Sequence, residues 1–128
     1  MKYLIFLFTL SLLLLFSCSR DKRLDHYAQI IDSADKIVFY ARHADIFAIT
    51  KNVDSLVYLR NIKNILKRNI KPENQRKFIA RHKIEIYRHE KLLGVLLISG
   101  PKEDPFVNFT NGTFGFGFKL TYGIGMSL

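Results

Sequence analysis

The residues best suited to acid–base chemistry or metal binding in this sequence are its four histidines, His26, His43, His82 and His89. None of them has a recognised metal-binding spacing such as His-Glu-x-x-His. His82 and His89 belong to one short stretch that also contains Glu85 and Glu90. Two imidazoles and a carboxylate could hold a metal ion or act as a general acid and base. One hypothesis is therefore a small hydrolase or metal-binding protein that uses His82 and His89. The alternative is that all four are ordinary surface histidines.

Other catalytic patterns are missing from the sequence. It has no Gly-x-Ser-x-Gly segment, which would indicate the nucleophile turn of a serine hydrolase. Gly115-Phe116-Gly117 lacks the third glycine and the lysine of a phosphate-binding loop. The single cysteine excludes an intramolecular disulfide and a cysteine-based zinc site. We therefore assign no catalytic residue, no metal ligand and no cofactor, and favour a protein that is not an enzyme.

The amino terminus has the layout of a secretory signal peptide. Lys2 supplies a positive charge, and the run from Tyr3 to Phe16 contains only Thr9 and Ser11 as weakly polar residues. An apolar run of about 7–15 residues is typical of a signal peptide, whereas a membrane-spanning helix needs about 20. The sequence therefore predicts export rather than a permanent transmembrane helix.

The apolar run ends at Leu15-Phe16-Ser17-Cys18, and Cys18 is the only cysteine in the chain. Leu15, the small Ser17 and Cys18 resemble the lipobox of bacterial lipoprotein precursors. In that family the cysteine sulfur receives a diacylglyceryl group and the chain is cut just before the cysteine. The resemblance implies a signal peptide over residues 1–17 and a lipidated Cys18 with a polar tether over residues 18–23. It predicts a lipoprotein anchored in the inner or outer membrane of the bacterial cell envelope.

A basic segment accounts for most of the formal net charge of +9. Residues 60–83 contain nine lysines or arginines, and Glu73 is their only acidic residue. We take the first five of these cations as a candidate binding surface, the basic patch, formed by Arg60, Lys63, Lys67, Arg68 and Lys71. Such a patch attracts anionic lipid head groups, an anionic envelope polymer or an acidic protein. Nucleic acid is a poorer partner for an exported chain. The segment predicts one basic surface on an otherwise nearly neutral domain.

Two helices are expected to position these residues. The first spans Leu24–Ala34, where apolar residues recur three and four positions apart. The second spans Asp54–Asn69, with Asn52 or Asp54 as its N-terminal cap and Pro72 beyond its end. Its expected buried face comprises Tyr58, Leu59, Ile62, Ile65 and Leu66.

Four strands are expected before the final segment of the chain. They span Lys36–Ala41, Ile46–Thr50, Lys83–Arg88 and Leu92–Ser99. The last two form a hairpin around a turn at His89–Lys91, and Glu73–Arg81 is expected to be a loop or one helical turn. Gly100–Pro105 is expected to be a loop because of its glycine and prolines.

A second hairpin is predicted at Asn111-Gly112, which favours a type I′ turn because both central residues need a positive φ. A two-residue turn would pair Thr110 with Thr113 and Phe109 with Phe114. Apolar residues then alternate with small or polar ones to the end of the sequence, and the glycines predict a break near residues 122–125.

These elements predict a single α+β domain over residues 24–128, with two helices packed on a small, mainly antiparallel sheet that includes two C-terminal hairpins. The leading hypothesis is a lipid-anchored bacterial envelope lipoprotein whose domain is a non-catalytic binding or structural module with a basic surface. The alternatives are an exported hydrolase or metal-binding protein that uses His82 and His89, and a membrane-tethered inhibitor of the immunity type.

Overall fold

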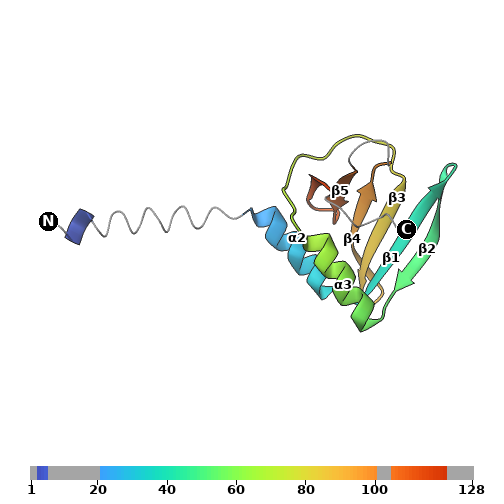
Figure 1. Ribbon diagram of the computed structural model, residues 1–128, viewed down its shortest axis with the longest axis horizontal. Coiled ribbons are helices and arrows are strands. Elements are labelled where there is room, and N and C mark those ends of the chain that lie inside the picture. The colour runs from blue at the N-terminus through green and yellow to red at the C-terminus, as the bar shows by residue number, and fades with distance from the viewer. Residues whose placement is uncertain (1–2, 6–20, 101–104, 121–128) are drawn as a thin grey trace.

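The computed structural model describes residues 3–5, 21–100 and 105–120. Within residues 21–120 it contains two helices and six strands (Figure 1). In chain order they are α2 (Lys22–Ser33), β1 (Lys36–His43), β2 (Ile46–Val53), α3 (Leu56–Lys67), β3 (His82–Arg88), β4 (Lys91–Ile98), β5 (Phe106–Thr110) and β6 (Gly115–Lys119). Most of the predicted signal peptide, Cys18, part of the predicted loop after residue 100 and the expected break at residues 122–125 lie outside the described residues.

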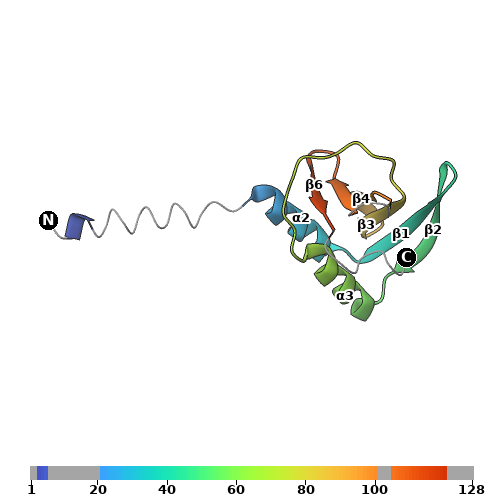
Figure 2. The ribbon, with the colours of Figure 1, turned by 45° about the horizontal axis from the view of Figure 1, so that its top comes forward.

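All six strands form one sheet in the order β2-β1-β3-β4-β5-β6, and every neighbouring pair is antiparallel. Helices α2 and α3 lie together against one face of this sheet, as the two ribbon views show (Figure 2). The predicted α+β class is confirmed, with two helices on an antiparallel sheet and the C-terminal hairpins β3–β4 and β5–β6.

The core lies between the helices and the inner face of the sheet. Tyr27 of α2 is buried among aromatic rings, with its ring centroid 4.9 Å from that of Phe109 and 5.5 Å from that of Phe116. Its hydroxyl donates a hydrogen bond to the backbone carbonyl of Leu66 in α3 over 2.7 Å. The side chain of Tyr27 therefore joins both helices to the last two strands. Ile31, Ile37, Phe39, Leu59, Ile84, Ile86, Leu96 and Phe118 complete the centre of this core.

Helix α3 differs from its prediction at both ends. Its N-terminal cap is Ser55, so neither Asn52 nor Asp54 has that role, because β2 continues through Val53. The helix ends at Lys67, before the expected Asn69, which has a left-handed φ of 52°. The predicted buried face is confirmed at Leu59 and Leu66, whereas Tyr58 is 62% exposed because the first turn of α3 extends beyond the core.

The turn predicted at Asn111-Gly112 has a different form. Phe109 pairs with Phe116 and Thr110 with Gly115, so the loop has four residues and the predicted register is wrong by two. Gly112 has a φ of 93°, but Asn111 does not have a positive φ. Instead, the Asn111 side-chain oxygen accepts hydrogen bonds from the backbone N–H groups of Thr113 and Phe114. An even shift leaves each side chain on its predicted face of the sheet.

A tight two-residue turn occurs instead between β3 and β4. Arg88 pairs with Lys91, and the intervening His89 and Glu90 have φ values of 50° and 64°. Two successive positive φ angles are the feature that the sequence predicted at Asn111-Gly112. The His89 backbone N–H donates to the Asp35 carboxylate over 2.8 Å, which fixes this turn against the end of α2.

The segment between α3 and β3 is an extended loop without a helical turn. Glu73 forms a two-way backbone bridge with Gly117 of β6, with N···O distances of 2.7 and 2.8 Å. The chain then crosses the outer face of the sheet, the face away from the helices, where the Arg76 backbone exchanges two hydrogen bonds with the side chain of Asn108. The loop therefore covers the β6 edge of the sheet.

Candidate functional site

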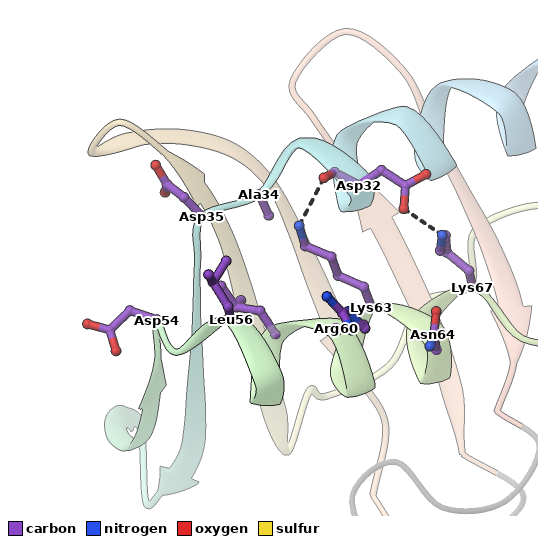
Figure 3. A pocket seen from close by; sticks show the side chains of 10 residues that line it. Asp32, Ala34, Asp35, Asp54, Leu56, Arg60, Lys63, Asn64 and Lys67 are labelled. Atoms are coloured by element: carbon purple, nitrogen blue, oxygen red, sulfur yellow. Dashed lines mark hydrogen bonds and ion pairs between the residues drawn. The ribbon is translucent and has the colours of Figure 1, made fainter.

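The basic patch lies on α3 and on the segment that follows it. Arg60, Lys63 and Lys67 are within the helix, Arg68 is its C-terminal cap and Lys71 follows it in the loop. Because α3 packs beside α2, the cations of the helix face the C-terminal end of α2 across a shallow pocket (Figure 3).

Two of the five patch residues have a structural role. Lys63 Nζ donates to the backbone carbonyl of Asp32 over 2.9 Å, and Lys67 Nζ lies 2.5 Å from the Asp32 carboxylate. The Lys63 contact satisfies a carbonyl in the last turn of α2, where backbone acceptors have no partner within the helix, and Lys67 pairs with the carboxylate of the same residue. Lys63 and Lys67 therefore help to hold α3 against α2 (Figure 3).

The pocket between the helices has a volume of about 360 Å³. Its charged lining consists of three aspartates, Asp32, Asp35 and Asp54, and three cations, Arg60, Lys63 and Lys67. The formal charges of the lining cancel, and Lys63 and Lys67 already contact Asp32. The pocket is therefore not a built anion site. The accessible positive charge of the patch belongs to Arg60, Arg68 and Lys71, for which no ion pair occurs within residues 21–100 and 105–120.

Arg68 and Lys71 lie on the side of the domain at which the chain enters α2. The hydrogen bond between Tyr27 and Leu66 places the last turn of α3 beside the first half of α2. The two helices run in opposite directions, so the residues after Leu66 extend towards the start of α2 (Figure 1). Lys22 and Arg23 open that helix, and Arg23 pairs with Asp21 over 3.1 Å.

Two of the remaining cations of the basic segment, Arg76 and Lys83, lie on another face. Lys83 Nζ is 4.4 Å from the ring centroid of Tyr40 and 5.0 Å from that of Phe47, on the outer face of the sheet. The Arg76 guanidinium is 4.1 Å from the ring centroid of Phe106, below the crossing loop. The expectation of one basic surface is therefore wrong. The segment leaves the helix layer after Lys71 and crosses the sheet, so its charge is divided between two faces.

A polar cluster on the outer face of the sheet, formed by Tyr40, Glu85 and Tyr87, was not predicted from the sequence. Hydrogen bonding to Glu85 raises the pKa of the Tyr40 hydroxyl well above its ordinary value near 10. Burial, together with the charge of Glu85, raises the pKa of the Tyr87 hydroxyl. The sequence feature that could have predicted this cluster is the period-two spacing of Lys83, Glu85 and Tyr87, because it places all three on one face of a strand.

The histidine hypothesis is wrong in its geometry. His82 opens β3 and His89 follows its last residue, so they are about 23 Å apart at 3.3 Å per residue. His89 Nδ1 faces Asp35 at 3.6 Å, whereas His82 pairs with Ala41 and Ile98 at the opposite end of the strand. Across the described parts of the chain, no group of three histidine, cysteine, aspartate or glutamate residues could hold a metal ion.

Comparison with known proteins leaves the family open. No family model, curated protein or solved structure matches the chain. None of the helices in the described residues is long and apolar enough to cross a membrane. The function must therefore be inferred from the residues and geometry of this chain alone.

Proposed function

We propose that the protein is a lipid-anchored lipoprotein of the bacterial cell envelope, and that its domain is a non-catalytic module that binds an anionic membrane surface. The observation that carries the proposal is the position of the end of α3, where Arg68 is the cap and Lys71 follows, on the side at which the chain enters α2. In this proposal, the same side of the domain receives the lipid from Cys18 and carries the free positive charge.

The tether supports this arrangement because it is short. Only Ser19 and Arg20 separate Cys18 from Asp21, the N-terminal cap of α2, so the tether comprises three Cα–Cα steps. At about 3.5 Å per step these three steps span at most about 10 Å, which is close to the Debye length at physiological ionic strength. A lipid on Cys18 would hold the start of α2 at the head groups, within range of their negative charge.

The energetics favour two weak attachments that act together. Stable anchoring needs either two acyl chains or one chain with a basic surface, and each lysine or arginine near an anionic surface contributes roughly 1 kcal/mol. Arg68 and Lys71, with Arg60 further back along α3, would then orient a domain that the acyl chains only tether. Membrane orientation, rather than chemistry, is the role that these residues support.

The anchor is tested with Cys18→Ala. We expect the variant to leave the membrane fraction under conditions that retain the wild type, and to lose the gel-mobility shift that lipidation produces. Unchanged fractionation and mobility would contradict the anchor.

The surface is tested with the triple variant Arg60→Glu, Arg68→Glu and Lys71→Glu, which avoids the lysines that contact Asp32. A charge-matched control changes the exposed residues Lys77, Arg88 and Lys91 to glutamate. Both are compared with the parent chain in flotation assays with phosphatidylglycerol or phosphatidylcholine vesicles, in a Cys18→Ala background that has no acyl chains. Residues 1–16 are identical throughout, so differences report on the domain.

We expect only the patch variant to lose its preference for anionic vesicles, by about 100-fold in affinity if each cation contributes roughly 1 kcal/mol. Raising the salt concentration should abolish the same preference in the parent chain, because exposed charges are screened. Equal losses in the patch and control variants would show that net charge, and not this surface, determines binding.

A further inference from the structure

Three cations meet at one corner of the outer face of the sheet. Arg42 of β1 donates its backbone N–H to the carbonyl of Arg81 over 2.9 Å, so these two residues lie opposite each other, one step beyond the pair Ala41–His82. Side chains of directly opposite residues share one face of a sheet. Lys83 follows Arg81 by two residues and therefore lies on that face too. We name Arg42, Arg81 and Lys83 the outer-face cluster.

Aromatic rings hold part of this cluster in place. Lys83 Nζ lies 4.4 Å from the ring centroid of Tyr40 and 5.0 Å from that of Phe47. The guanidinium carbon of Arg42 lies 5.8 Å from the same Phe47 centroid. An aromatic face attracts a cation but carries no net charge that could neutralise it. The rings therefore position these side chains and leave their positive charge uncompensated.

The carboxylate on the same face of β3 does not balance this charge. Glu85 lies two residues beyond Lys83, but it interacts with Tyr40, whose pKa is raised by hydrogen bonding to Glu85. No ion pair between Glu85 and Lys83 occurs in the described parts of the chain. The Lys83 ammonium group is thus half-buried beside two rings without a carboxylate partner among these residues.

The two arginines are also poorly compensated. Asp45 lies 3.6 Å from Arg42, but its side chain is fully exposed, and ion pairs of this kind contribute little. Arg81 is exposed and has no ion pair within residues 3–5, 21–100 and 105–120. Like charges directly opposite each other on neighbouring strands destabilise a sheet. The chain therefore holds an arrangement that a bound anionic group would stabilise.

Apolar side chains adjoin the outer-face cluster. The strand register places one row of residues across β2, β1, β3 and β4, namely Ile49, Tyr40, Lys83 and Leu97. Ile49 is 64% exposed, and Leu97 is partly exposed. Arginine, aromatic and apolar side chains together are typical of protein–protein interfaces. A small inorganic anion would contact the cations alone, whereas a peptide would also cover the apolar row.

We propose that this part of the outer face binds an acidic peptide segment of a partner protein, with the carboxylates of the peptide at the outer-face cluster and its apolar side chains on the adjoining row. A guanidinium group can pair with a carboxylate through two parallel hydrogen bonds. The surface lies on the face away from the helices and is separate from the basic patch on α3 (Figure 2). The proposal does not depend on the membrane binding proposed above.

The test measures the binding of a labelled peptide by fluorescence anisotropy. The probe is a short peptide of glutamate and leucine, and it is compared with a peptide in which glutamine replaces every glutamate. The protein is the full chain with Cys18→Ala, which has no acyl chains. The outer-face variant carries three further substitutions, Arg42→Gln, Arg81→Gln and Lys83→Gln. The matched control removes three charges from the basic patch instead, through Arg60→Gln, Arg68→Gln and Lys71→Gln.

We expect the parent chain and the control to bind the glutamate peptide with similar affinity. The outer-face variant should bind it about tenfold more weakly, which is the effect expected from the loss of three partly exposed ion pairs. Equal affinities of the parent chain and the outer-face variant would overturn the proposal. A glutamine peptide that binds the parent chain as tightly as the glutamate peptide would overturn it as well.

A charge reversal separates loss of binding from loss of folding. Arg81→Glu places a carboxylate opposite Arg42, so the like-charge pair becomes an attractive one and the melting temperature should rise. The same variant should bind the glutamate peptide more weakly than the parent chain. A folded Arg81→Glu variant with the affinity of the parent chain would contradict the proposal.

Vesicle flotation distinguishes this proposal from the proposed function. The outer-face variant should keep its preference for phosphatidylglycerol vesicles, and the control should lose that preference. If the outer-face variant loses the vesicles and the control retains them, the outer face binds a membrane and the peptide proposal is wrong. If neither variant changes vesicle binding while the outer-face variant loses the peptide, the membrane role of the basic patch alone is contradicted.

Discussion

The hydroxyl of Tyr27 donates a hydrogen bond to the backbone carbonyl of Leu66, 2.7 Å away, and so connects α2 to the last turn of α3. A carbonyl in the last turn of a helix has no N–H donor within its own helix. Tyr27→Phe should therefore leave a buried acceptor without a partner and lower the free energy of unfolding by about 1–2 kcal/mol. Urea denaturation measures the change. Tyr58→Phe is the control, because Tyr58 is 62% exposed and should change stability little.

Alkaline pH should destabilise the fold through its tyrosines. Burial raises the pKa of the Tyr27 hydroxyl, and hydrogen bonding to Glu85 raises that of Tyr40. A phenol with a raised pKa binds its proton more tightly in the folded state. Its contribution is complete below the unfolded pKa of about 10 and is lost as the pH rises above that value. Melting temperatures between about pH 8 and pH 11 should fall more steeply in the wild type than in Tyr27→Phe. Equal slopes would contradict this assignment.

Gly94 occupies a position where the core has no room for a side chain. A Cβ atom there would lie 2.7 Å from Cε2 of Phe109, which is fully buried. Gly94→Ala should lower the free energy of unfolding by about 1–3 kcal/mol through overpacking. Gly100→Ala is the matched control, because its nearest neighbour is the flexible side chain of Arg81 at 3.0 Å. A smaller effect at Gly94 than at Gly100 would show that the Phe109 ring is free to move.

The β3–β4 turn should become more stable with glycine at its first central position. His89 has a φ of 50°, and a left-handed conformation costs a residue with a side chain about 1–2 kcal/mol. His89→Gly removes this strain and keeps the backbone N–H that donates to Asp35, so we expect a gain of about 0.5–1 kcal/mol after the entropy of glycine. Lys91→Gly, one step into β4, should instead destabilise. Thermal unfolding of the two variants gives opposite shifts if the turn is as described.

Local patterns predicted the elements better than the details that depend on distant contacts. The spacing of apolar residues in α2 and the alternation in β3 and β4 were sufficient to locate those elements within two residues. The register of β5 and β6 was not predictable from Asn-Gly alone, because the Asn111 side chain organises a longer loop by accepting hydrogen bonds from Thr113 and Phe114.

The candidate site shows the same division between local and distant effects. The sequence identified the cations of α3, but their use depends on Asp32, which lies 31 residues before Lys63. No local pattern predicts that Lys63 and Lys67 serve the packing of two helices while Arg60, Arg68 and Lys71 remain available. The separation of Lys83 from the patch likewise follows from the path of the loop after Lys71, which crosses to the other face of the sheet.

The packing of Tyr27 against Phe109 and Phe116 joins the beginning of the domain to its end. During synthesis, α2 emerges before the strands, but the aromatic partners of Tyr27 arrive only with the last two strands. The aromatic packing around Tyr27 therefore cannot be completed until β5 and β6 are present. This architecture makes the last two strands necessary for a core that begins at the first helix of the domain.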